Sequence, residues 1–302
     1  LSSGVRRQRV SFEDYRTQIA KVQPDPAGSG VASSDAQRIG HTVDPSGRAG
    51  QRFGPGAHQY SPDDAADSGT GHPGPARADP FDAAFDMSDP VARQLRRYGD
   101  LSREERTRRL AELAEEIKAC QRCPLAFGRT SAVPGAGVLD PLVMVVGEGP
   151  GREEDLQGIP FVGNAGKYLD KWLSAVGLSR DENTFIGNIV KCRPPYNRDP
   201  KPEESSACAG YLYEQIALIR PKVILTAGRI SMRLLTGTTT GITKIHGTFF
   251  DFHGIPILPT FHPSAVLRNP EWRRPVWEDL KALRDHLTGY QEYTPPAESG
   301  EH

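Results

Sequence analysis

Four cysteines carry the clearest chemical signal of this 302-residue chain. Cys120 and Cys123 form a C-x2-C pair at the end of a predicted helix, and Cys192 and Cys208 follow with 15 residues between them. The chain has no other cysteine, and its N-terminus lacks the apolar segment of a secretory signal, which favours a metal site over disulfides. Four thiolates suit Zn²⁺ or an iron–sulfur cluster about equally. Four ordinary thiols are the simpler alternative.

Three polar or glycine-rich motifs follow predicted strands and form the second signal. They are the GEGPG stretch at 147–151, the stretch from 188 to 197, and the HPS stretch at 262–264. The G-x-G-x-G spacing is not the G-x-G-x-x-G of a dinucleotide site, and no Lys-Ser/Thr follows it as in a P-loop. Its small residues instead allow a ligand to approach the backbone closely.

The elements that position these motifs can be read from hydrophobic periodicity. Apolar runs predict strands at 142–146, 185–190, 223–226 and 255–259, and amphipathic patterns predict helices at 104–119, 165–176, 203–220, 230–235 and 272–287. This alternation predicts a parallel sheet with helices on both faces. Because open sheets of this kind bind ligands beyond the carboxyl ends of their strands, the three motifs should meet in one cleft.

The composition changes near residue 90. Residues 1–90 contain 11 Gly, 9 Pro and only 12 Ile, Leu, Val or Phe, which is too little apolar material to form a core. This segment is therefore predicted to be a disordered tail, most simply a solvated one. The alternative is that it recruits a partner, for example through residues 10–15.

The overall charge and hydropathy exclude two classes of protein. The formal net charge is −1, which argues against a purely electrostatic nucleic-acid binder. No apolar run reaches the roughly 18 residues of a membrane-spanning helix. The expected location is the cytoplasm.

In combination, these motifs resemble family 4 uracil-DNA glycosylases, over about residues 105–290. The resemblance rests on the four cysteines and on the stretches at 147–151, 154–155, 160–163, 188–195, 197–198 and 262–264, which occur in the family's order. It implies a three-layer α/β/α fold with a four-stranded parallel sheet. It also implies a [4Fe–4S] cluster on Cys120, Cys123, Cys192 and Cys208. The expected domains are a tail at 1–90, a glycosylase domain at 91–290 and a flexible C-terminal tail at 291–302.

The resemblance also implies how uracil is recognised, once its nucleotide is flipped out of the DNA. The Asn188 amide offers a donor and an acceptor that match uracil O4 and N3–H. Phe161 is expected as an exposed ring that stacks on the flipped base. The Glu154 region is the expected wall beside C5, which excludes thymine. The other expected substrate-binding residues are Gly149, Asn197 and Ser264.

Departure of uracil leaves positive charge on the sugar and negative charge on uracil O2. His262 is expected to donate a hydrogen bond to that anion. Glu148 is expected to stabilise the sugar cation or to orient water, with Glu154 and Asp155 as alternatives. The simpler interpretations are that His262 caps a loop and that Glu148 bonds loop amides.

The DNA itself should meet loops at the same rim. Basic side chains there are expected to contact phosphates. Leu267, or Val266 beside it, is expected to wedge into the gap left by the flipped base. The basic residues are Lys191, Arg193, Arg198, Lys244 and Arg268.

The leading hypothesis is a monomeric, monofunctional enzyme that releases uracil from DNA and leaves an abasic site. It is expected to be at the nucleoid when it acts on DNA, and replication or repair proteins are the expected partners of the N-terminal tail. The main rival is a non-catalytic iron–sulfur DNA-binding module of a polymerase or repair complex. A third alternative is a glycosylase acting mainly on another deaminated base.

Overall fold

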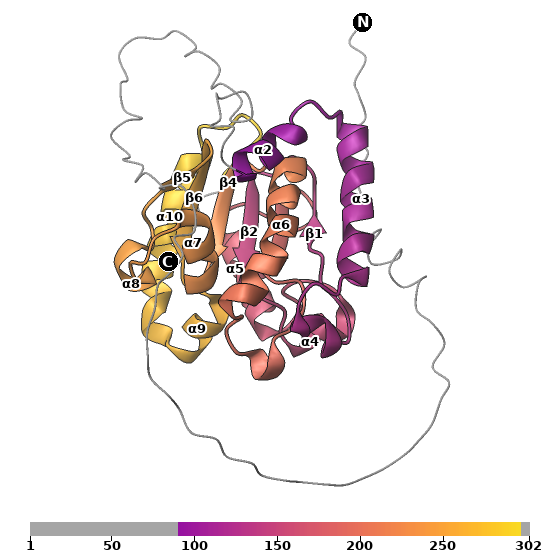
Figure 1. Ribbon diagram of the computed structural model, residues 1–302. Helices are drawn as coiled ribbons and strands as arrows, with labels where there is room; N and C mark the ends of the chain where they lie inside the picture. Colours follow the sequence, from indigo (N-terminus) through magenta and orange to yellow (C-terminus); the bar gives the residue numbers. More distant parts are fainter. Residues whose placement is uncertain (1–89, 297–302) are drawn as a thin grey trace, which may run out of the picture.

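The computed structural model describes residues 90–296 (Figure 1). The predicted N-terminal tail lies outside this range except for Pro90, which begins helix α2 (Pro90–Arg97). At the other end, the predicted boundary at 290 is too early. Tyr293 is buried and its hydroxyl donates a 2.8 Å hydrogen bond to the carbonyl of Val176. The folded part therefore includes residues just beyond 290.

A six-stranded sheet forms the middle layer, in the order β1-β3-β2-β4-β6-β5. Its four central strands are parallel, as predicted: β2 (Val143–Gly147), β3 (Thr184–Asn188), β4 (Val223–Ala227) and β6 (Ile255–Thr260). The expected total of four strands is wrong. Two short antiparallel strands, β1 (Ala136–Gly137) and β5 (Phe250–Phe252), extend the edges, and neither is long enough to show a clear alternation in the sequence.

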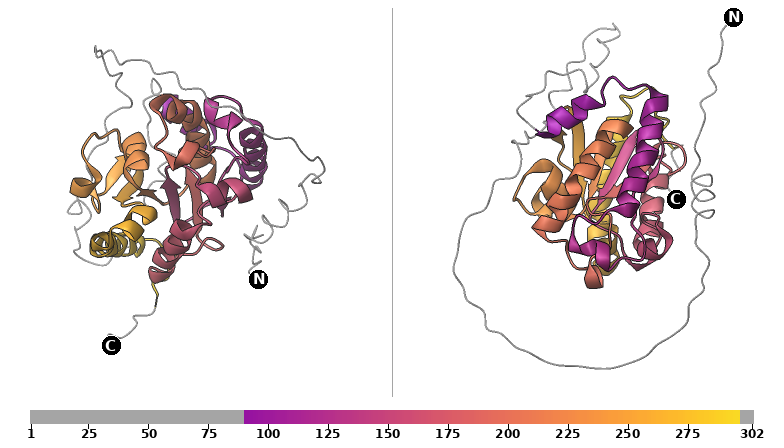
Figure 2. Two further views of the ribbon diagram at one scale, coloured as in Figure 1. Left: turned by 90° about the horizontal axis from the view of Figure 1, so that it is seen from below. Right: turned by 45° about the vertical axis from the view of Figure 1, so that its right-hand side comes forward.

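Alternating side chains of the sheet divide the core between two faces. Met144 and Val146 of β2 point to one apolar cluster, and Val143 and Val145 point to the other. On the first face lie α2, α3 (Arg103–Ala119), α6 (Pro202–Ile219) and α7 (Arg229–Thr236), and on the second lie α5 (Asn164–Ala175), α9 (Pro263–Arg268) and α10 (Arg273–Leu287). The result is the predicted three-layer arrangement (Figure 2).

Shorter elements complete the chain. Helix α4 (Arg152–Gln157) follows β2, and α8 (Ile242–Ile245) precedes β5; the 3-10 turns are η3 (Pro124–Phe127), η4 (Pro195–Asn197) and η5 (Pro270–Trp272). Helices α4 and α9, which follow β2 and β6, lie at the lower end of the molecule in Figure 1. This end is therefore the carboxyl edge of the parallel strands. Among residues 90–296, no helix combines the length and apolar character needed to cross a membrane.

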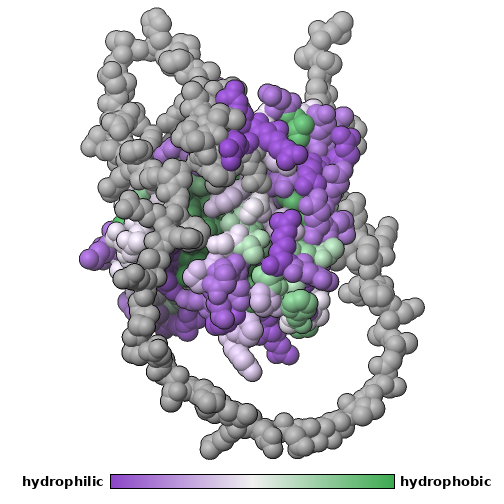
Figure 3. Space-filling model, in the orientation of Figure 1, coloured by the Kyte–Doolittle hydropathy of each residue, from purple (hydrophilic) through white to green (hydrophobic). Residues whose placement is uncertain are grey.

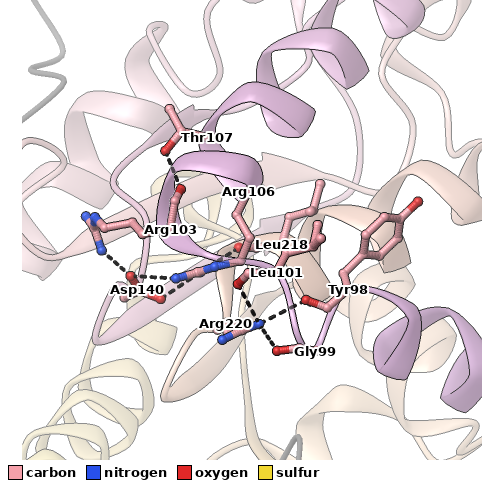
Figure 4. Close-up of polar contacts among 9 residues, drawn as sticks. All are labelled: Tyr98, Gly99, Leu101, Arg103, Arg106, Thr107, Asp140, Leu218 and Arg220. Carbon is pink, nitrogen blue, oxygen red and sulfur yellow. Dashed lines mark hydrogen bonds and ion pairs between the residues drawn. The ribbon is translucent and has the colours of Figure 1, made fainter.

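Helix α3 carries Cys120 at its C-terminus and is fixed to the rest of the fold by one buried and one half-buried arginine (Figure 4). The Arg106 guanidinium donates to Asp140 and to the carbonyl of Leu218, both at 2.8 Å. Arg220 donates to the carbonyl of Tyr98 at 2.9 Å in the turn before α3. The outward side of α3 is hydrophilic (Figure 3). These contacts dock the helix so that the cysteine pair has a defined place.

Candidate active site

Side chains from three strand ends meet in the space above Gly147. Gly147 pairs in register with Asn188 of the neighbouring strand. A Cβ on Gly147 would clash with Asn188 Oδ1 and would lie 2.5 Å from Cζ of Phe161. The Phe161 ring lies 5.7 Å from the ring of His262, which follows β6. Glycine at this position therefore lets the Asn188 amide and the Phe161 ring pack directly against the backbone at the end of β2, with the His262 ring beside Phe161.

Asn188 presents an unused hydrogen-bonding group to this space. Its side chain is 1% exposed, and its Oδ1 has no hydrogen-bond partner among the described residues. An unpaired buried acceptor costs about 1–3 kcal/mol, so such groups are generally paired or functional. The amide is therefore suited to receive an N–H donor from a ligand.

His262 is the N-cap residue of α9. Ser264 holds its ring in one tautomer. The backbone N–H of Ser264 donates to His262 Nδ1 at 3.2 Å, and the Ser264 hydroxyl lies 2.7 Å from the same nitrogen. Because Nδ1 accepts, the ring proton is on Nε2. Burial, together with the positive charge of Arg268, lowers the pKa of His262 to about 4, although Glu154 acts in the opposite direction. His262 is thus a neutral donor at pH 7. Ser264 contacts this ring rather than lining the space itself.

Glu148 is a carboxyl group with a raised pKa at this edge of the sheet. Burial, the negative charge of Asp199 and a hydrogen bond with Asp199 together raise the pKa of Glu148 to about 7, against the attraction of Arg229. Arg229, at the start of α7, forms an ion pair with Asp199. A hydrogen bond between two carboxyl groups requires a shared proton. The sequence motifs gave no signal for Asp199 or Arg229, since neither lies in the GEGPG or HPS stretch.

Glu154 performs the structural task that was considered for Glu148. Its Oε1 accepts hydrogen bonds from the backbone N–H groups of Val162 and Gly163, at 2.8 and 2.9 Å. Its Oε2 accepts from the N–H of Gly151 at 3.0 Å. Both oxygens are thereby engaged, and the carboxylate joins the loop after β2 to the loop that carries Phe161. This geometry favours a positioning role over the expected catalytic one.

Phe161 is buried rather than exposed, contrary to expectation. Its side chain is only 3% exposed, and its backbone has a left-handed φ of 52°. Arg180 donates to its carbonyl at 2.5 Å, and a Cβ on Gly166 of α5 would clash with the same carbonyl. Tertiary contacts thus hold the ring as an inner wall of the space above Gly147.

Gly149 and Asn197 lie farther out. A Cβ on Gly149 would lie 2.7 Å from Cγ2 of Val190 and 3.5 Å from Cδ of Pro194, so glycine lets two loops pack closely. Asn197 is exposed, and its Oδ1 accepts a 2.8 Å hydrogen bond from Arg193 Nε. The amide of Asn197 is therefore part of the rim rather than of the inner space.

The expected contact between Lys191 and a DNA phosphate is wrong, because this side chain lies inside the protein. The side chain is 1% exposed. Its Nζ donates to the backbone carbonyl of Asn188 at 2.8 Å and to Gln215 Oε1 at 2.6 Å. The ammonium is consequently a buried support beneath Asn188 and does not reach the surface.

The other side chains expected to contact DNA lie at the surface or near it. Lys244, Leu267 and Arg268 are exposed, and Arg193 and Arg198 are half-buried. Arg198 is not free, because it forms two hydrogen bonds with Glu204, at 2.7 and 2.8 Å. Its principal contact is thus with the N-terminus of α6.

Comparison with known proteins identifies the family. Residues 134–281 match the model of the uracil DNA glycosylase superfamily. The chain is 45% identical to the type-4 uracil-DNA glycosylase of Thermotoga maritima over 179 residues, which cover 58% of this chain and 93% of that relative. The chain belongs to the type-4 uracil-DNA glycosylases. Two further type-4 relatives agree: Sulfurisphaera tokodaii at 42% identity (61% of this chain, 88% of the relative) and Saccharolobus solfataricus at 43% (58% and 85%).

The four cysteines of this glycosylase gather beside α3 and α6. All four are free thiols, with Cys192 and Cys208 buried and the other two partly exposed. Burial raises the pKa of Cys208 to about 11, and the negative charges of Cys192 and Cys123 add to this effect. Such mutual electrostatic effects require the thiols to be close to one another.

Donors already surround these sulfurs. Arg129 Nη1 lies 3.0 Å from Cys192 Sγ, the backbone N–H of Lys191 lies 3.4 Å from Cys208 Sγ, and that of Arg122 lies 3.4 Å from Cys120 Sγ. Within residues 90–296, no three His, Cys, Asp or Glu side chains are arranged to hold a single metal ion. The four thiols are of the kind that hold either an iron–sulfur cluster or Zn²⁺.

Proposed function

We propose that this glycosylase takes a flipped uracil into the space above Gly147 and hydrolyses its N-glycosidic bond, leaving free uracil and an abasic site. A base in duplex DNA must leave the stack before an enzyme can act on it. The observation that carries the proposal is the unpaired, buried Oδ1 of Asn188. The test is release of free uracil from an oligonucleotide that contains it.

The Asn188 amide accounts for selection of uracil over cytosine. Its Oδ1 accepts from uracil N3–H, and its Nδ2 donates to uracil O4. Cytosine presents the opposite pattern, with an acceptor at N3 and a donor at N4, and would leave buried groups unpaired. Lys191 supports this reading by holding the backbone carbonyl of Asn188 from below.

Exclusion of thymine needs a different cause from exclusion of cytosine. Thymine differs from uracil by one methyl group, and attractive contacts alone discriminate poorly against a methyl group. The loops joined by Glu154 supply the wall beside C5. Three hydrogen bonds from loop amides hold that carboxylate in place. Its rigidity supports a steric role.

His262 stabilises the leaving group. Its neutral ring donates from Nε2 to uracil O2 as negative charge develops there. The neutral ring carries its proton on Nε2, and the contacts from Ser264 to Nδ1 already orient it. Stabilisation of this kind is commonly worth about 3–4 kcal/mol.

Glu148 acts as a carboxylate toward the sugar cation or the attacking water. Its pKa of about 7, set by burial and by Asp199, predicts that the single-turnover rate rises with pH and reaches half its plateau near pH 7. Asp199→Asn removes the neighbouring negative charge and should move this midpoint to lower pH by about one unit. Rates measured from pH 5 to 9 check both statements. Equal midpoints in the two proteins would show that Asp199 does not act on Glu148.

The proposed cofactor is a [4Fe–4S] cluster held by Cys120, Cys123, Cys192 and Cys208. When bound, the cluster supplies a structural crosslink, because hydrolysis needs no redox partner. It would join α3 to the chain segment that follows Asn188 and to α6. Arg129 and two backbone N–H groups already donate toward the sulfurs.

Anaerobically purified protein should therefore be brown and contain about four irons per chain. Cys192→Ala should lower the yield of folded protein more than it changes the rate of the protein that does fold, because metal binding and folding are coupled. Metal analysis and visible absorption provide the measurement. Stoichiometric zinc without iron would contradict this proposal.

Two other predictions extend this function. The chain is proposed to act as a cytoplasmic monomer on uracil-containing DNA, and its first 90 residues are proposed to contribute nothing to chemistry. A non-catalytic module is less well supported, because a pure binder has no need to bring Glu148, Asn188 and His262 to one edge of the sheet.

A further inference from the structure

Tyr196 has the most exposed large apolar side chain of the described residues. It is 99% exposed and lies at the centre of the 3-10 turn η4. Its backbone is left-handed, with φ 56° and ψ 21°. Residues with a Cβ rarely adopt this conformation, so glycine or asparagine would be the favourable choice there.

Nothing within the fold explains an aromatic ring at this position. A side chain that is 99% exposed packs against no other part of residues 90–296. The ring therefore makes no contact within these residues that could offset the free-energy cost of the left-handed backbone. Its contribution must come from a contact outside residues 90–296.

The turn presents this ring from a rigid base. The N–H of Asn197 donates to the carbonyl of Pro194 at 3.0 Å, and the N–H of Arg198 donates to that of Pro195 at 3.2 Å. The guanidinium of Arg198 is held by Glu204. Because the backbone that carries the ring is already fixed, binding has to order only the side-chain torsions of Tyr196.

The same turn forms the rim of the uracil site. Before Tyr196, Pro194 packs close to Gly149 in the loop after β2. After it, Asp199 is close enough to Glu148 to raise the pKa of that carboxyl group, and it is paired with Arg229. Tyr196 thus lies between two contacts with the catalytic edge, and Arg193 provides a positive charge close by. A flat ring flanked by cations matches the stacking platforms of proteins that bind unpaired nucleic-acid bases.

We propose that Tyr196 stacks on a base of the uracil-containing strand next to the flipped nucleotide. This inference rests on the proposed function, because the occupant is the DNA substrate. The stacking partner becomes available when flipping removes its neighbour. Tyr196 is thereby a positioning residue that holds the strand open, in addition to the expected wedge at Leu267.

The test uses an oligonucleotide with 2-aminopurine beside a stable abasic analogue. Wild type and Tyr196→Phe should bind it and quench the fluorescence of 2-aminopurine by stacking. Tyr196→Ala should bind roughly ten-fold more weakly and lose the quenching. Tyr196→Gly should bind as weakly as Tyr196→Ala, yet melt at a higher temperature than wild type, because glycine accepts the left-handed backbone.

The inference is overturned if Tyr196→Ala binds and quenches like wild type with 2-aminopurine on either side of the analogue. All variants are also assayed for uracil release under single-turnover conditions. Absence of release by the wild type would refute the proposed function. Normal release by the wild type with unchanged binding by Tyr196→Ala would refute only the stacking role.

Discussion

His262→Ala should lower the single-turnover rate of uracil release by about 10²–10³-fold, with little change in DNA affinity. The ring is a neutral donor fixed by two contacts from Ser264 to Nδ1. It acts on charge that appears only as the bond breaks, so its loss affects the transition state rather than the bound substrate. Single-turnover rates and affinities measured side by side separate these effects.

Ser264→Ala is the matched control. It removes the hydroxyl near Nδ1 but keeps the backbone N–H that donates to the same nitrogen, so the rate should fall much less. Because the pKa of His262 is about 4, neither variant should alter the pH dependence above about pH 5. A His262→Ala protein with the wild-type rate would remove His262 from the mechanism.

Asn188→Asp should lower the rate on uracil by roughly 10²–10³-fold. The substitution keeps the shape of the side chain but replaces the N–H₂ donor with an acceptor, which faces uracil O4. Two mismatched groups in a buried site, each worth about 1–3 kcal/mol, give a loss of this size. Selectivity for uracil over cytosine should weaken as well, and the measurement is the ratio of the two excision rates.

Asn197→Asp makes the same chemical change outside the site. Asn197 is exposed and its Oδ1 bonds Arg193, so its replacement should leave base selectivity unchanged. A similar loss in both variants would mean that the charge change, rather than contact with the base, lowers the rate. Unaltered selectivity in Asn188→Asp would show that another group reads the uracil edge.

The central strands and long helices could be predicted because their signals are local. Continuous apolar runs gave β2, β3, β4 and β6, and amphipathic periodicity gave α3, α5, α6, α7 and α10. The edge strands β1 and β5 have two and three residues and carry no period. Helix α4 has six residues, too short for an amphipathic pattern to be distinguished from a charged loop.

The roles of the site residues could be predicted only in part from local sequence patterns. Motif position indicated Asn188 and His262, but it could not reveal that Lys191, in a polar stretch, turns inward to Gln215. Likewise, the sequence does not distinguish the roles of Glu148 and Glu154, which lie in the same segment after β2. Only the fold shows that loop amides surround Glu154 whereas a second carboxyl group, Asp199, faces Glu148. Such roles depend on residues brought together by tertiary structure.

The most direct measurement is the amount of free uracil released from an oligonucleotide with a single uracil, alongside strands that carry cytosine or thymine at that position. Wild-type protein should release one uracil for each abasic site revealed by alkali, and should leave the other two strands intact. Asn188→Asp and His262→Ala should be slow in the same assay. Folded, iron-loaded wild type that binds the strand but releases no uracil would contradict the account.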